Sequence, residues 1–278
     1  MENQASAALI APPGTGPSAG SLAEKVSSLS SLQRERLKLN WEAVVQRIRT
    51  AESAARRKEG SCRLLAVVKN QPDEVVEALL ELGQHDVAEN RVQPLLQRPE
   101  ALRTRARFHL VGPLQSNKVK KAAPWIHSFH GLDSLRLANL LDAEMAVKGR
   151  VLEVFLQINI SGEQNKHGCP LGLASTLAVG VQRHAHLKVI GLMGMAAISE
   201  DPGDSRPAFQ RLAELASEMQ RQNVLPEDAR ELSMGMSNDL EPAVEEGATV
   251  VRVGSALFAG LKTASVHDPE DSAEGPDS

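Results

Sequence analysis

From residue 63 onward, short apolar segments alternate with amphipathic ones, and this alternation constrains the fold more than any other feature. Several of the apolar segments are continuous runs, as expected for parallel strands buried on both faces. The predicted strands are Leu64–Val68, Asp86–Glu89, Arg107–Val111, Ile126–Gly131, Leu152–Asn159, Val189–Met195, Glu231–Met234 and Val250–Gly254. The helical patterns between them are Glu74–Leu82, Leu135–Val147, Leu173–His184, Phe209–Gln222 and Leu240–Glu246. This order predicts an α/β protein with a single (β/α)₈ barrel of the TIM type.

A doubly wound open sheet is the alternative fold. Its dinucleotide signature, G-x-G-x-x-G after the first strand, is missing from this sequence. The chain has 278 residues, a length that suits one barrel. We therefore favour the barrel.

Three regions are expected along the chain. Residues 1–30 are rich in Ala, Ser, Gly and Pro and are predicted to be a disordered extension. Residues 31–262 form the barrel together with an amphipathic N-terminal helix at 33–58. Residues 263–278 are predicted to be a flexible acidic tail.

Composition excludes several classes of function. The net charge of −4 gives no reason to expect nucleic acid as a partner, and no apolar run is long enough to cross a membrane. The N-terminus does not read as a secretory signal, and two cysteines are typical of a cytoplasmic protein with free thiols. The eight histidines lack companions at ligand spacing, so no metal site is predicted. We expect a monomer, because the helix at 33–58 can cover one end of the barrel.

Residues suited to chemistry follow three of the predicted strands. Lys69 ends the first strand, at the face where barrel active sites are built, and a lysine amine can form a Schiff base there. The loops after the last two strands, which often bind phosphate in such barrels, contain Ser233-Met234-Gly235 and Gly254-Ser255. Hydroxyls and close backbone approach at glycine both suit an anion. Each feature alone is as well explained by an ordinary turn, but together they favour a phosphate site beside Lys69.

Arg252 stands on the last strand, where a guanidinium is costly to desolvate without a partner. Beside a pyridine nitrogen it would donate a hydrogen bond and keep that nitrogen unprotonated, which weakens the ring as an electron sink. The alternative is a structural ion pair with Glu245 or Glu246. Asn90, at the end of the second strand, is either a polar contact at the mouth or the start of a turn.

In this order, the motifs resemble those of the pyridoxal phosphate (PLP) homeostasis protein family over residues 35–260. The matching stretches include Leu65-Ala66-Val67-Val68-Lys69, Glu89-Asn90, His109-Leu110-Val111-Gly112, Lys166-His167-Gly168, Gly191-Leu192-Met193, Ser233-Met234-Gly235-Met236-Ser237 and Arg252-Val253-Gly254-Ser255. The resemblance implies a barrel like the N-terminal barrel of alanine racemase, standing without the racemase's second domain. It implies PLP bound on Lys69, Arg252 near the pyridine nitrogen, and a cofactor site completed by Asn90, Met193, Ser233, Met234, Gly235, Gly254 and Ser255. One departure is Arg91, which stands where the family usually has tyrosine.

The resemblance further implies a role in intracellular PLP (vitamin B6) homeostasis, with PLP-dependent apoenzymes as candidate partners and at most a weak side activity. The first alternative is a PLP-dependent amino-acid racemase acting through Lys69. Racemisation needs a second base, which a tyrosine supplies in the related racemases, and this sequence contains no tyrosine. The second alternative is a binding protein that contacts RNA or another protein through the basic face of the helix at 33–58.

Overall fold

The computed structural model describes residues 29–163 and 167–261. Most of the predicted N-terminal extension and the whole predicted acidic tail therefore lie outside the described residues. Of the extension, Leu29 is buried and Ser30 caps the first helix, accepting a hydrogen bond from the backbone N–H of Gln33. The ordered part of the chain thus begins slightly earlier than the predicted boundary at residue 31.

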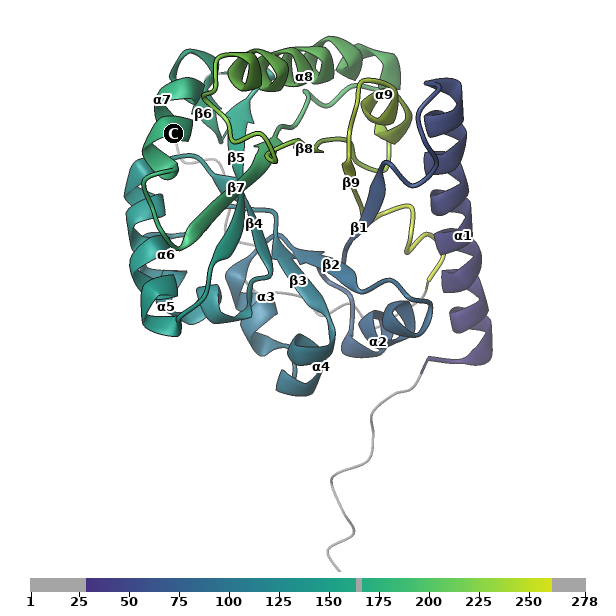
Figure 1. Cartoon of the computed structure of the whole chain (residues 1–278). Coiled ribbons are helices and arrows are strands. Elements are labelled where there is room, and N and C mark those ends of the chain that lie inside the picture. The colour runs from purple at the N-terminus through teal and green to yellow at the C-terminus, as the bar shows by residue number, and fades with distance from the viewer. Residues whose placement is uncertain (1–28, 164–166, 262–278) are drawn as a thin grey trace, which may run out of the picture.

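Parallel strands surrounded by helices form a closed barrel (Figure 1). The strands are β1 (Arg63–Val67), β2 (Asp86–Glu89), β3 (Arg107–Leu110), β4 (Ser128–Leu132), β5 (Leu152–Asn159), β6 (Cys169–Pro170), β7 (Leu187–Met193), β8 (Glu231–Ser233) and β9 (Val250–Val253). Neighbours pair in the order β1-β2-β3-β4-β5-β7-β8-β9, and β9 pairs with β1 to close the ring. The two-residue β6 pairs with β5 outside this ring. The predicted barrel is confirmed, and the open sheet is wrong.

Helices cover the outside of the barrel. They are α1 (Ser31–Ala54), α2 (Asp73–Glu81), α3 (Val92–Gln97), α4 (Glu100–Arg105), α5 (Val119–Ala122), α6 (Leu135–Lys148), α7 (Ala174–Val181), α8 (Arg206–Arg221) and α9 (Leu240–Glu245). The helix predicted at 33–58 ends earlier, because Arg56 adopts φ = 54°, a conformation that an α-helix cannot contain. The short helices α3, α4 and α5 escaped prediction, since one or two turns are too short to show a helical period.

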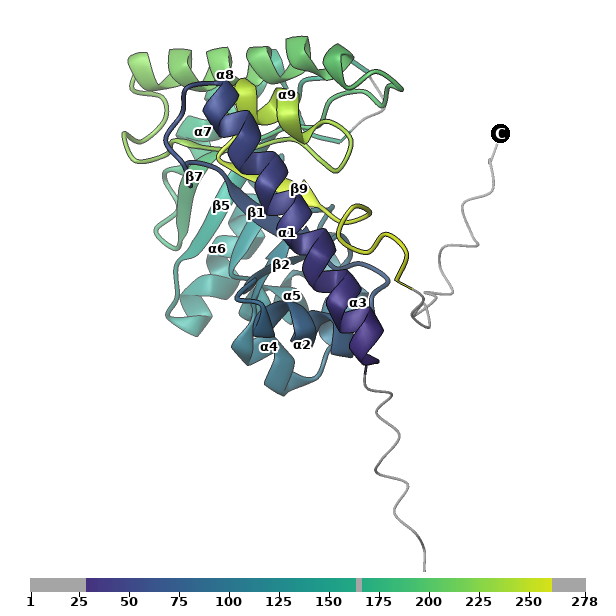
Figure 2. The ribbon, with the colours of Figure 1, turned by 90° about the vertical axis from the view of Figure 1, so that its right-hand side faces the viewer.

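Helix α1 lies along the side of the barrel rather than over one end, which corrects the position expected from the sequence (Figure 2). Leu37, Val44 and Ile48 form its buried face, which packs against β1, α2 and α9. The side-chain amide of Asn40 donates to the carbonyl oxygens of Leu257 and Ala259, both at 2.9 Å. The N-terminal helix therefore occupies the place beside β1 and β9 where a regular barrel carries the helix after its last strand.

The inside of the barrel has two kinds of side chain. Leu65, Ala88, Phe155, Ile190, Met193 and Val250 form a small apolar cluster there. Polar side chains carried by β3, β4, β8 and β9 are also buried, namely His109, Ser128, His130, Ser233 and Arg252. Successive side chains of a strand point to opposite faces, so His109 on β3 and Val111, directly after its end, both face the inside of the barrel. Polar groups in a barrel interior need partners, and these partners define much of the site described below.

No helix in the described ranges is long and apolar enough to cross a membrane.

Candidate functional site

A cavity of about 640 Å³ opens at the carboxyl ends of the strands, a size typical of small-molecule sites. Its walls come from the segments that follow β1, β2, β3, β7, β8 and β9. The lining side chains that argue for a function are Lys69, Asn90, Arg91, Arg252 and Ser255, together with the backbone of Gly112 and Gly254. This is the face at which barrels of this kind place their ligands.

The structure brings five of the nine predicted site residues to the cavity wall: Lys69, Asn90, Arg252, Gly254 and Ser255. The other four lie behind that wall. Met193 belongs to the apolar cluster inside the barrel, and Met234 packs in the outer core. Ser233 is fully buried, and the carbonyl oxygen of Gly235 accepts a hydrogen bond from the backbone N–H of Arg252 at 3.0 Å.

The turn that carries Lys69 is fixed by its own geometry. Asn70 adopts φ = 61°, and the backbone N–H of Gln71 donates to the carbonyl oxygen of Val68 at 3.1 Å. This tight turn leaves the Lys69 side chain exposed at the mouth of the barrel. The amine is therefore accessible to a ligand in the cavity.

A buried arginine also holds that turn from below. The guanidinium of Arg98 donates to the carbonyl oxygens of Val68 at 3.0 Å and Gln71 at 2.8 Å. It pairs with the buried Glu89 at 2.8 Å and with Asp73 at 2.7 Å. Burial alone would lower the pKa of Arg98, but the two carboxylates outweigh this and raise it, so the cation is retained. Arg98 thus ties the Lys69 turn to the end of β2.

Gly112, just after β3, allows the close approach of two strand ends. A Cβ atom at this position would lie 2.0 Å from the backbone oxygen of Asn90, far inside contact distance. Any side chain here would force the ends of β2 and β3 apart and move Asn90. The residue is therefore a requirement of the cavity wall rather than of a turn.

Arg252 is buried at the base of the cavity and is held by oxygens that carry no full charge. One terminal nitrogen donates to the carbonyl and hydroxyl oxygens of Ser233, at 2.6 and 2.8 Å, and the other donates to the carbonyl oxygen of Gly194 at 3.0 Å. Burial lowers the pKa of Arg252 to about 10, so it remains a cation at neutral pH. The ion pair suggested as an alternative does not form, because Glu245 and Glu246 both pair with Arg206.

The loops after β8 and β9 present backbone donors to the cavity. The hydroxyl of Ser237 accepts from the backbone N–H of Ala256 at 3.3 Å and so joins the two loops. Within the part of the chain that the structure describes, the backbone N–H groups of Asn238 and Ser255 have no hydrogen-bond partner. Gly254 lies so close to β1 that a Cβ would be 3.1 Å from the oxygen of Val67. Free N–H groups on two joined loops suit an anionic group such as a phosphate.

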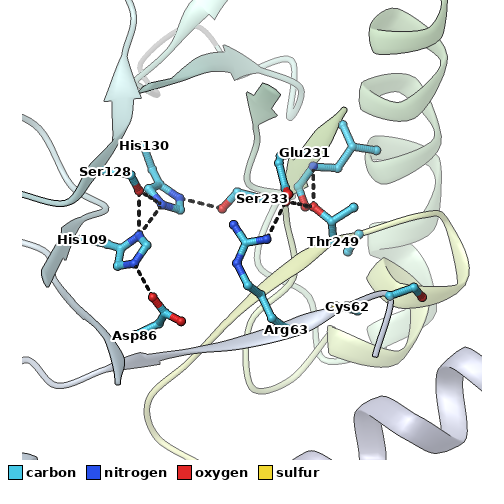
Figure 3. Close-up of polar contacts among 12 residues, drawn as sticks. Cys62, Arg63, Asp86, His109, Ser128, His130, Glu231, Ser233 and Thr249 are labelled. Atoms are coloured by element: carbon cyan, nitrogen blue, oxygen red, sulfur yellow. Dashed lines mark hydrogen bonds and ion pairs between the residues drawn. The ribbon is translucent and has the colours of Figure 1, made fainter. Parts of the chain in front are cut away.

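Sequence reasoning missed the role of Arg98 and the set of polar side chains inside the barrel. Figure 3 shows these polar side chains extending from Asp86 to Ser233 across the barrel. The alternation of side chains along β3 and β4 could have revealed this set, because His109, Ser128 and His130 occupy positions that face the inside of the barrel. Among residues 29–163 and 167–261, no group of three or more His, Cys, Asp and Glu side chains is placed to hold a metal ion.

Known proteins resemble this chain in sequence and in fold. The profile of the family described as alanine racemase, N-terminal domain, matches residues 39–262. A pyridoxal phosphate homeostasis protein of Aquifex aeolicus is 38% identical over 222 residues, which cover 79% of this chain and 96% of that protein. The structure of PipY from Synechococcus elongatus, with PLP bound, is 31% identical and has a TM-score of 0.65, covering 76% of this chain and 99% of PipY. An alanine racemase of Clostridium difficile shares the fold at 12% identity, with a TM-score of 0.65 over 82% of this chain and 60% of the racemase.

Proposed function

Because this chain belongs to the pyridoxal phosphate homeostasis protein family, whose barrel is that of the alanine racemase N-terminal domain, we propose that it binds PLP and serves PLP homeostasis. PipY aligns with this chain over 99% of the length of PipY, and its structure contains bound PLP. This bound cofactor supports PLP as the ligand. The candidate site is the cavity at the carboxyl ends of the strands. Bound PLP supplies an aldehyde that reacts reversibly with amines.

One observation carries the assignment of this cavity. Arg252 is a buried cation that lines the cavity, and among the described residues no carboxylate forms an ion pair with it, although the nearby Asp239 acts on its charge from the same cavity wall. The N–H groups of a buried cation need hydrogen-bond acceptors, and a ligand with an acceptor at that point supplies one. A pyridine nitrogen is such an acceptor.

The other parts of the proposed site follow from the same geometry. Lys69 holds the cofactor as a Schiff base, because its amine is exposed at the mouth of the same cavity. The free N–H groups of Asn238 and Ser255 bind the phosphate, and Asn90 contacts the ring from the end of β2. Met193, Ser233, Met234 and Gly235 support this wall from behind rather than contacting the ligand.

We propose a binding and carrier role rather than catalysis. A two-base racemisation needs a second acid or base opposite Lys69, and the sequence contains no tyrosine to supply the base used by the related racemases. PLP-dependent apoenzymes are the proposed recipients, and the cytoplasm is the proposed location. A protein that delivers PLP has to release it, which an exposed lysine at an open mouth permits.

We propose a monomer that does not bind nucleic acid. The basic face of α1 is partly neutralised, since Arg34, Arg47 and Arg49 form ion pairs with Glu81, Glu241 and Glu59. Few free cations are left on that face to replace the counterions of a phosphate backbone. Binding to RNA that weakens steeply as salt is added would contradict this part of the proposal.

The direct experiment is an absorbance spectrum of the protein incubated with PLP, followed by borohydride reduction and peptide mass mapping. The expected result is a visible band and a reduced pyridoxyl mass on Lys69. Lys69→Ala removes both, whereas Lys188→Ala, at the amino end of β7 and paired with Asp228, leaves both intact. A label on another lysine, or no band at all, would refute the assignment of the site.

A separate assay tests the racemase alternative. The loaded protein is incubated with a panel of L-amino acids, and the D-enantiomers are measured by chiral chromatography. The carrier proposal predicts no D-enantiomer formation above the level of free PLP. Turnover that is lost in Lys69→Ala and retained in Lys188→Ala would establish an enzyme instead.

A further inference from the structure

A continuous set of hydrogen bonds crosses the inside of the barrel from Asp86 to Arg252 (Figure 3 shows its course as far as Ser233). The nitrogen Nε2 of His109 lies 3.0 Å from Oδ1 of Asp86. The hydroxyl of Ser128 lies 2.7 Å from Nδ1 of His109 and 3.1 Å from Nε2 of His130. Nδ1 of His130 lies 2.9 Å from the hydroxyl of Ser233, which in turn lies 2.8 Å from Arg252. We call this set, from Asp86 to Ser233, the polar relay.

The two ends of the relay fix the direction of its hydrogen bonds. Arg252 has donors and no acceptor, so it donates to the hydroxyl of Ser233. At the other end, burial alone would raise the pKa of Asp86, but hydrogen bonds from Arg107 and His109 hold it well below its usual range. The carboxylate therefore only accepts, and His109 donates to it through Nε2–H.

The middle of the relay has a single arrangement that satisfies every group. Burial lowers the pKa of His109 and lowers that of His130 well below the usual range, so both rings are neutral and each carries one N–H. With its Nε2 protonated, His109 accepts at Nδ1, and the hydroxyl of Ser128 donates to it at 2.7 Å. His130 then donates from Nε2 to the Ser128 oxygen and accepts the Ser233 proton at Nδ1.

The opposite tautomer of His130 fails on two contacts. Its Nε2 would become an acceptor 3.2 Å from Nδ1 of His109, which is also an acceptor, and the single proton of Ser128 cannot serve both. The Ser233 hydroxyl would receive protons from both Arg252 and His130, which leaves its own proton without an acceptor in the relay. A buried polar group without a hydrogen-bond partner is costly, and this cost selects one tautomer.

We propose that the polar relay positions Arg252 for its contact with the ligand, with Ser233 as the residue through which His130 and Asp86 act. The proposal rests on the proposed function only for the identity of the ligand. Three N–H groups of Arg252 are engaged by Ser233 and Gly194, and a guanidinium has five. Two therefore remain for the cavity that Arg252 lines, and the relay sets their direction by holding the Ser233 oxygen as an acceptor.

The first test needs no cofactor. Long-range ¹H–¹⁵N correlation spectra of the ligand-free protein distinguish the two neutral tautomers and the charged ring of each histidine, and single His→Gln variants assign the signals. The expected result is a neutral Nε2–H form for both His109 and His130 at pH 7. A charged ring or an Nδ1–H form at either position would overturn the proposal, whether or not the protein binds PLP.

The second test measures the effect on the ligand. Ser233→Ala is expected to weaken PLP binding about tenfold and to shift the Nδ1 signal of His130 towards that of a nitrogen without a hydrogen bond. The matched control is Ser205→Ala, because Ser205 is also buried and lines the cavity but donates only to the carbonyl oxygen of Pro202, at 2.6 Å. Ser233→Thr retains the hydroxyl and is expected to restore both measurements.

The outcomes separate the two proposals. Loss of PLP affinity in Ser233→Ala with recovery in Ser233→Thr supports the positioning role. Unchanged affinity in Ser233→Ala, or an equal loss in Ser205→Ala, overturns it while the PLP site itself stands. Failure of the parent protein to bind PLP overturns the proposed function. In that case the tautomers observed for His109 and His130 still show whether the relay has the proposed hydrogen bonds.

Discussion

Replacement of Arg98 by methionine is expected to destabilise the barrel and to disturb the Lys69 turn. The substitution leaves the carboxylate of Glu89, which is 0% exposed, without its cation. It also removes the donors to the carbonyl oxygens of Val68 and Gln71. Loss of the contact with Asp73 adds little to the destabilisation, since that side chain is 40% exposed and solvent screens the pair.

Removing one partner of a buried ion pair costs about 3–5 kcal/mol. For a domain of this size, each kcal/mol lowers the melting temperature by about 2–4 °C, so Arg98→Met should lower it by roughly 6–20 °C. The assay is thermal unfolding of the ligand-free protein, followed by circular dichroism and checked by urea unfolding. Imine formation by PLP should weaken in the same variant, because residues 68–71 lose their anchor.

Two further variants make the reasoning refutable. Arg105→Met removes an exposed arginine that lies 3.8 Å from Glu77, and should change the free energy of unfolding by about 0.5 kcal/mol or less. Glu89→Met with Arg98→Met removes both charges and should recover more than half of the loss, because an apolar pair carries no desolvation penalty. An Arg98→Met variant as stable as Arg105→Met, or a double variant no better than the single one, would show that the ion pair does not hold this turn.

Three other predictions follow from the site and the core. Gly112→Ala, whose Cβ would lie 2.0 Å from the oxygen of Asn90, should lower the urea midpoint and abolish PLP loading, whereas Gly172→Ala, with nothing within 4 Å, should do neither. Asp86 has a folded pKa below its unfolded value of about 3.9, so its contribution to stability is complete above that pH and is lost as the pH falls. The difference in unfolding free energy between parent and Asp86→Asn should therefore stay constant above about pH 5 and shrink as the pH falls from about 5 towards 2, and a constant difference over that lower range would contradict the assignment. Burial raises the pKa of Cys62 to about 12, so a thiol reagent at pH 8 should label it only after the protein is unfolded in urea.

The fold was predictable because its signal is local. The buried parallel strands are short apolar runs, and two of them, Asp86–Glu89 and Leu152–Asn159, have the bounds expected from the sequence. The residues that reach the cavity were predictable where they end a strand, as Lys69, Asn90 and Arg252 do. Such positions meet at one face of any closed parallel barrel.

The rest depends on contacts between distant residues. The link between His130 and Ser233 spans 103 positions and exists only because barrel closure brings β4 and β8 within reach of each other. Nothing local distinguishes an inward histidine paired in this way from an exposed one. Arg98 lies on a short connection between α3 and α4, where a charged residue usually faces solvent, and its burial follows from the packing of that connection under Lys69.

The position of α1 has a consequence for how the chain is made. A ribosome releases this helix before any strand of the barrel, yet its partners Glu241 and Leu257 are synthesised some two hundred residues later. Throughout that interval the apolar stripe formed by Leu37, Val44 and Ile48 can pack against β1 and α2 but lacks α9. The nascent chain therefore carries a helix whose apolar face is only partly covered until nearly all of the barrel has emerged, and this partly exposed face favours aggregation or chaperone binding during synthesis. By the same reasoning, joining α1 behind residue 261 in a circular permutant would turn these contacts into local ones and speed folding.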